Sequence, residues 1–166
     1  VLGRRPVLER RPLDAPAVIP SALWLRCARV LERLGDHAMR GVLVDLAELA
    51  AEASSPEGAH DAREVVPRVV QLFEAAVTAA EALVRVERVL AYTAPPHDTS
   101  QQRTADEART ALVQRLLAGL STMSTLVVGS PSSGAARALE EATSDLAREV
   151  ELREQALAEV EALTRA

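Results

Sequence analysis

The sequence has very few aromatic residues and almost no isoleucine. Trp24, Phe73 and Tyr92 are the only aromatics among 166 residues, and Ile19 is the only isoleucine. Because β-sandwiches and barrels are rich in such side chains, this shortage argues against a sheet protein. Alanine, leucine and valine supply most of the apolar 48%, and alanine and leucine are strong helix formers. The composition therefore predicts an all-α fold.

Lysine and asparagine are absent altogether. All nineteen basic residues are arginines, and the formal net charge is −5. Residues with codons rich in A and T are rare, which indicates a GC-rich genome such as those of actinobacteria and alphaherpesviruses. The arginine content is therefore weak evidence for nucleic-acid binding, and the negative charge argues against a large phosphate-binding face. We expect no nucleic-acid partner.

Paired cysteines and long apolar runs are also missing. Cys27 is the only cysteine, so an internal disulfide is excluded and a reducing intracellular compartment is favoured. No uninterrupted apolar run approaches the roughly 18 residues that span a bilayer, so we expect no membrane insertion. The first residues also lack the apolar stretch of a signal peptide.

Residues that interrupt helices, namely proline, glycine and serine, divide the chain into an arm and a helical domain. Four prolines and two arginine pairs predict an extended arm or linker over 1–20, with a basic docking peptide as the alternative. Ser21 is a good N-cap for a helical domain over 21–166. The expected helices cover about 21–53, 61–92, 99–128 and 135–165. The first residue is Val1 and the last helix reaches the chain end, so we expect a segment of a larger protein.

Apolar residues recur along each expected helix at steps of three and four. The fold we predict is four long helices in an elongated up-down bundle or a coiled-coil-like rod. Within 21–53, Gly35 and Gly41 predict a close helix contact or a bend. The helix over 61–92 has two apolar edges, with a seam broken only at Glu87, so we expect it between two neighbours. The predicted core and interface residues are Trp24, Leu31, Phe73, Leu83, Leu90, Leu116, Leu146 and Leu157.

No complete catalytic set is present in the sequence. The histidines His37, His60 and His97 are scattered, and no two have the spacing of a metal pair on one helix. Cys27 lies on an apolar stripe, where it is expected to act as a small core residue rather than a nucleophile. We therefore predict a protein that is not an enzyme and needs no cofactor.

One charged cluster could bind metal. Glu32 and Asp36 are four residues apart and would share a face of one continuous helix, where two carboxylates could ligate a cation. The string Leu31-Glu32-Arg33-Leu34-Gly35-Asp36 resembles the helix signature of PhoU-type phosphate-signalling proteins, and this resemblance implies a metal-binding regulator with Glu32 and Asp36 as ligands. The related string that starts at Glu87 lacks the glycine and the aspartate. The simpler interpretation is a solvated face on which Asp36 pairs with Arg40.

The leading hypothesis is a non-catalytic helical scaffold or stalk that mediates protein–protein assembly, with self-association as one form. Arginine without lysine, alanine-rich helices and joints rich in serine, proline and glycine resemble the rod-like part of alphaherpesvirus large tegument proteins. That resemblance implies protein partners, and a place in the virion tegument or in the host cell. A helical domain from an actinobacterium is a further interpretation.

Overall fold

The computed structural model describes residues 18–54, 62–92, 99–128 and 134–165. These residues form five α-helices, and no strand occurs among them. The helices are α1 (Ser21–Leu34), α2 (Met39–Ala53), α3 (Ala62–Tyr92), α4 (Thr99–Val128) and α5 (Ala135–Arg165). The all-α prediction is confirmed, whereas the predicted number of helices is wrong by one. Most of the predicted arm, residues 1–17, lies outside the described residues.

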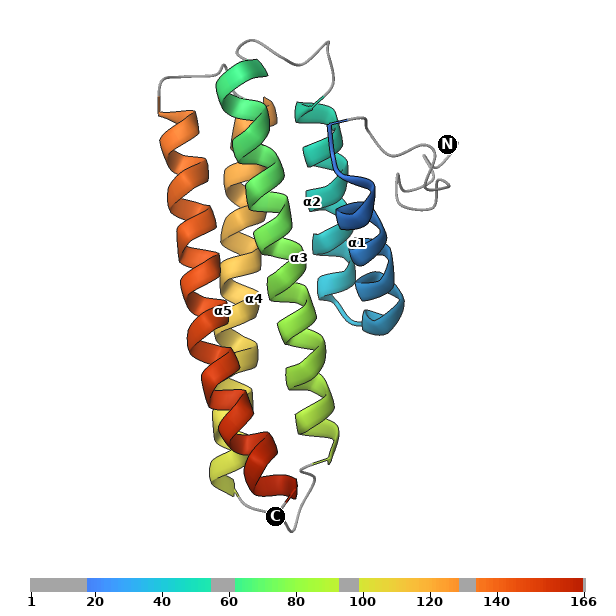
Figure 1. Cartoon of the computed structure of the whole chain (residues 1–166), viewed down its shortest axis with the longest axis vertical. Coiled ribbons are helices and arrows are strands. Elements are labelled where there is room, and N and C mark those ends of the chain that lie inside the picture. Colours follow the sequence, from blue (N-terminus) through green and yellow to red (C-terminus); the bar gives the residue numbers. More distant parts are fainter. Residues whose placement is uncertain (1–17, 55–61, 93–98, 129–133, 166) are drawn as a thin grey trace.

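The three long helices form the body of the molecule. Helices α3, α4 and α5 contain 31, 30 and 31 residues, which corresponds to about 45 Å each. They run in alternating directions and each packs on the other two (Figure 1). The shorter helices α1 and α2 form an antiparallel pair beside one end of this body, with α2 against α3 and α4 and with α1 against α3.

The predicted single helix over 21–53 is in fact two helices. Gly35 has φ 53°, a left-handed conformation that glycine adopts without steric cost. Its N–H donates to the carbonyl of Leu31 at 3.3 Å and closes α1. The chain then reverses, and α2 begins at Met39. Gly41 lies in the first turn of α2, and a Cβ there would meet no atom within 4 Å. The interruption predicted at Gly35 is therefore a complete reversal, and no close contact is present at Gly41.

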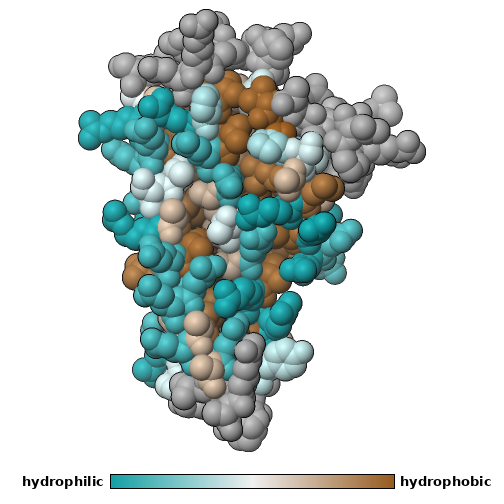
Figure 2. Space-filling model, in the orientation of Figure 1, coloured by the Kyte–Doolittle hydropathy of each residue, from teal (hydrophilic) through white to brown (hydrophobic). Residues whose placement is uncertain are grey.

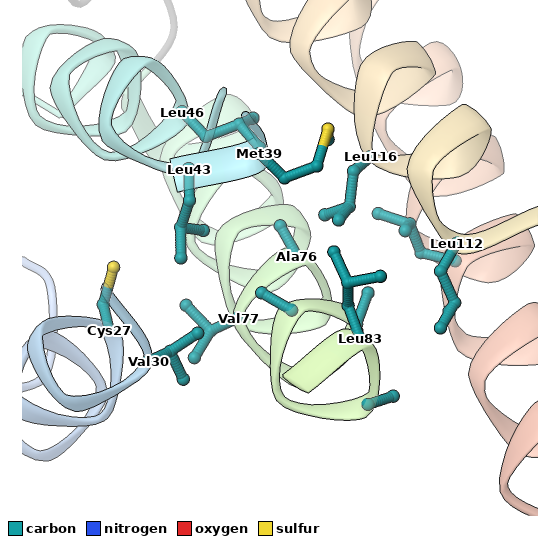
Figure 3. Packing of buried hydrophobic residues seen from close by; sticks show 14 of the residues in the cluster. Cys27, Val30, Met39, Leu43, Leu46, Ala76, Val77, Leu83, Leu112 and Leu116 are labelled. Carbon is teal, nitrogen blue, oxygen red and sulfur yellow. The ribbon is translucent and has the colours of Figure 1, made fainter. Parts of the chain in front are cut away.

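Helix α3 is the centre of the core and packs on all four other helices, not on two as expected. Figure 3 shows Val77 of α3 beside Val30 of α1, with Leu43 of α2 close by. On another side of α3, Leu83 lies towards Leu112 of α4. The structure places these predicted residues in the buried core: Trp24, Leu31, Phe73, Leu83, Leu116, Leu146 and Leu157. Leu90 is only partly buried against that core.

Pro67 lies inside α3 near its beginning, and the helix continues past it. Proline at this depth removes the N–H that would bond to the carbonyl four residues earlier, so the cost falls on the first turns of the helix only. Among the described helices, none is both long and apolar enough to cross a bilayer.

Candidate interaction surfaces

A polar cluster fastens the α1–α2 turn to the three-helix body. Nε2 of His37 lies 3.0 Å from Oε1 of Glu87 on α3. The backbone N–H of Met39 donates to Nδ1 of His37 at 3.1 Å. Since Nδ1 accepts that bond, the neutral ring must hold its proton on Nε2 and donate it to Glu87. Nη1 of Arg109, on α4, lies 4.0 Å from the same Glu87 oxygen. The cluster thus joins the α1–α2 turn, α3 and α4.

Replacing His37 with alanine should lower the free energy of unfolding by roughly 1–3 kcal/mol, because the bond from the Met39 N–H at the start of α2 and the bond to Glu87 are both lost. His37→Asn keeps a side-chain acceptor for the Met39 N–H but is too short for Glu87, so it should recover the part of that loss that comes from the Met39 bond. Urea unfolding measures both variants. ¹⁵N NMR of the imidazole should show the proton on Nε2 in the neutral ring, and a proton on Nδ1 would contradict the proposed tautomer.

Arg26 fastens α1 to α3 by a fork of hydrogen bonds. Its Nε and Nη2 donate to the two carboxylate oxygens of Glu81 at 3.0 and 2.9 Å, and Nη2 also donates to Oγ1 of Thr78 at 3.1 Å. The hydrogen bond to Glu81 is the main cause that raises the pKa of Arg26 above its ordinary value. Such two-pronged pairs fix orientation as well as charge. Arg26 therefore sets the register of α1 along α3.

Ion pairs on the other side of α3 hold α5. Arg68 lies 3.0 Å from Glu140, and Arg85 lies 3.3 Å from Glu161. Arg85 is also 3.8 Å from Glu154. Exposed pairs of this kind contribute at most about 1 kcal/mol each, so they specify register more than they add stability.

Four helices carry an exposed large apolar side chain. The exposed fractions are 40% for Leu25 of α1, 76% for Tyr92 of α3, 46% for Leu117 of α4 and 54% for Leu152 of α5. Single exposed apolar residues are common on monomeric proteins. Here they offer an apolar contact on each of four helices to any protein that lies alongside.

The surface between α3 and α5 is hollowed into a groove of about 430 Å³. Its lining comes from Gln71, Glu74, Ala75 and Thr78 of α3 and from Thr143, Ala147, Val150, Glu151 and Glu154 of α5. The charged residues in this lining are all acidic. A second groove, of about 660 Å³ between α4 and α5, is lined by charges of both signs, Arg103 and Arg153 with Asp106 and Glu107. The α3–α5 groove is thus distinguished by its single sign of charge.

The predicted metal pair does not lie on one helix face. Glu32 is in α1, but α1 ends at Leu34 and Asp36 lies in the turn. The expectation of a shared helix face, and of an Asp36–Arg40 pair across one helical turn, is wrong because Gly35 reverses the chain. Both carboxylates are exposed. Over the described part of the chain, no three of the residue types His, Cys, Asp and Glu are grouped as a metal site would need.

Metal binding by Glu32 and Asp36 stays a prediction that elemental analysis can test. We expect the purified chain and its Glu32→Ala/Asp36→Ala variant to contain equal, substoichiometric amounts of iron and zinc. Stoichiometric metal in the wild type that is lost in the variant would contradict this and favour the PhoU-like metal-binding regulator.

The remaining chemical candidates have structural positions or lie outside the described residues. Cys27 is a free thiol that is completely buried, and its burial raises the pKa of the thiol to about 12. His60 and His97 lie outside the described residues. The sequence did not predict the role of Glu87, which joins the α1–α2 turn, α3 and α4 through His37 and Arg109. Its position as the one polar residue in an otherwise apolar seam of α3 is the signal that could have indicated this role.

Comparison with known proteins yields no relative: no family model, curated protein or solved structure matches the chain.

Proposed function

We propose that the chain is a non-catalytic helical scaffold segment that mediates protein–protein assembly within a larger protein. The observation that supports this proposal is that grooves and exposed apolar side chains lie along the outside of long helices, while polar contacts join those helices to one another. The clamps at His37 and Arg26 use polar side chains to fasten helices to one another. Grooves and exposed leucines remain along the outside. Such a body presents surfaces at set spacings, which is what a scaffold requires.

The setting that we propose is a reducing intracellular compartment, with the tegument of an alphaherpesvirus as the specific case. A free, buried thiol is compatible with reducing conditions. The tegument rests on the composition alone, namely arginine without lysine and alanine-rich helices. In that setting the long helices would act as a rod, and α5 could extend it by pairing as a coiled coil with a second copy. We infer protein partners and no nucleic acid, since the net charge is −5.

Proximity labelling tests the proposal. The chain would be fused to a biotin ligase in the cells from which it comes, beside a variant with Leu25→Arg, Leu117→Arg and Leu152→Arg. These side chains are exposed, so the variant should fold, and circular dichroism checks that it does. We expect a defined set of proteins labelled by the wild type and reduced several-fold in the variant. Identical labelling by both would count against assembly through these surfaces.

A further inference from the structure

The floor of the α3–α5 groove consists mainly of methyl groups from small side chains of the two helices. Ala75 and Ala147 contribute small side chains, and Val150 is 6% exposed. The hydroxyl of Thr143 donates to the carbonyl of Leu139 at 2.7 Å. The hydroxyl of Thr78 likewise donates to the carbonyl of Glu74 at 3.0 Å, and it accepts from Arg26. The hydroxyl protons of both threonines are therefore already donated, so apart from Gln71 the floor offers mainly apolar atoms to a ligand.

Three carboxylates edge this floor, and two of them make only long ion pairs, at 3.8 and 3.9 Å. Glu74 lies 3.9 Å from Arg26, which makes its short contacts with Glu81 instead. Glu154 lies 3.8 Å from Arg85, which is closer to Glu161. No ion pair of Glu151 occurs within the described parts of the chain. Each of these carboxylates can therefore accept a further cation. The nearby arginines are shared with other glutamates, so the net charge around the groove stays negative.

The shape of the groove fits a helix. On α3 its lining runs from Gln71 to Thr78 and on α5 from Thr143 to Glu154, which corresponds to roughly two to three helical turns. Small side chains on the floor permit a third helix to approach the two walls closely. Apolar atoms lie between hydrophilic residues along the junction of α3 and α5 (Figure 2). An amphipathic helix lays its apolar face into such a groove and its polar flanks against the rim.

Charge selects among the possible occupants. An acidic rim around an apolar floor attracts a helix with arginine or lysine on both flanks of a narrow apolar stripe, and it repels an acidic helix. A second copy of α5, which is rich in glutamate, would bring like charges to the rim. We propose that the α3–α5 groove docks a basic amphipathic helix of a partner protein. This inference rests on the scaffold function and assigns one class of partner to one surface.

Two synthetic helical peptides with the same alanine and leucine stripe test the proposal, one flanked by arginine and one by glutamate. Each would be titrated into the ¹⁵N-labelled full chain at low salt. The arginine peptide should shift the amide signals of residues 71–78 and 143–154, and its affinity should fall steeply as salt is added. The glutamate peptide should shift none of them. Binding of both peptides with equal affinity, or shifts confined to other surfaces, would overturn the proposal.

Matched variants separate the groove from general acidity. Neutralising the rim with Glu74→Gln/Glu151→Gln/Glu154→Gln should weaken the arginine peptide about tenfold, as expected for the loss of three exposed ion pairs. The control Glu52→Gln/Glu107→Gln/Glu159→Gln removes the same charge from exposed positions elsewhere and should leave affinity within about twofold after correction for net charge. Ala147→Trp, at an exposed position of the floor, should block binding without changing any charge. Equal affinity for the rim and control variants would contradict the proposal.

The rim variant also belongs in the proximity-labelling experiment. If it leaves the labelled set unchanged while the leucine-to-arginine variant alters it, the groove inference fails and the scaffold proposal stands. If neither variant alters the set, both fail. If dilution of the wild type alone shifts the groove amides, the occupant is a second copy of the chain, and the inference of a basic partner is wrong.

Discussion

Phe73→Ala should lower the free energy of unfolding by about 3–5 kcal/mol, which is the range for truncating a fully buried phenylalanine. Phe73 is 0% exposed in α3, and its ring lies 6.2 Å from that of Trp24 in α1 at a tilt of 55°. The substitution removes buried apolar area and the contact with the Trp24 ring, and it leaves a cavity where the Phe73 ring was. Because the free energy of unfolding of small domains is only about 5–15 kcal/mol, this one change would remove a large part of the stability.

Urea unfolding monitored by circular dichroism measures this loss. Tyr92→Ala is the matched control, since it also removes a benzyl-sized ring from α3 but from a position that is 76% exposed. We expect it to change the free energy of unfolding by less than about 0.5 kcal/mol. Similar losses for the two variants would mean that Phe73 does not occupy a packed core.

The second large effect concerns Cys27 at alkaline pH. Burial raises the pKa of its thiol from 9.0 to about 12. Between these values the unfolded chain loses the thiol proton while the folded chain keeps it, so the unfolded state is favoured as pH rises. This contribution is fully present below pH 9 and disappears as pH passes the folded value. The free energy of unfolding should fall by about 1.4 kcal/mol for each pH unit between pH 9 and about 12.

The measurement is the difference between the wild type and Cys27→Ala, because this difference isolates the contribution of the thiol. The alanine variant should lack this part of the alkaline slope, whatever its stability at neutral pH. Equal slopes would show that the Cys27 thiol ionises as readily in the folded chain as in the unfolded one. A thiol reagent at pH 8 gives an independent reading, because a rise of three units lowers the thiolate fraction about a thousandfold. Labelling should become fast only in denaturant.

The chain reversal at Gly35 is the feature of the fold that the sequence does not predict. Apolar residues continue at helical steps from Trp24 to Leu49, and glycine in a helix costs only about 1 kcal/mol, so the sequence alone predicts one helix with a bend. The reversal depends on contacts that local pattern does not contain. Folding α2 back buries Met39 and Leu43 against the three-helix body, and His37 then accepts the N–H of Met39 and meets Glu87, 50 residues away. Apolar periodicity identifies which face is buried but not which neighbour covers it.

The sequence by itself determined the helical class, the approximate span of the three long helices and most of the buried residues. Composition and periodicity are local properties, and a strong apolar stripe must be covered whatever covers it. Only the tertiary structure decided that the first stripe belongs to two antiparallel helices, that α3 contacts four neighbours, and that Glu87 is a clamp. It also decided that Glu74, Glu151 and Glu154 edge one groove. Those facts depend on how helices that are distant in the chain are placed relative to one another. That placement is selected by helix–helix packing and a few charge-assisted contacts, and no local sequence pattern encodes it.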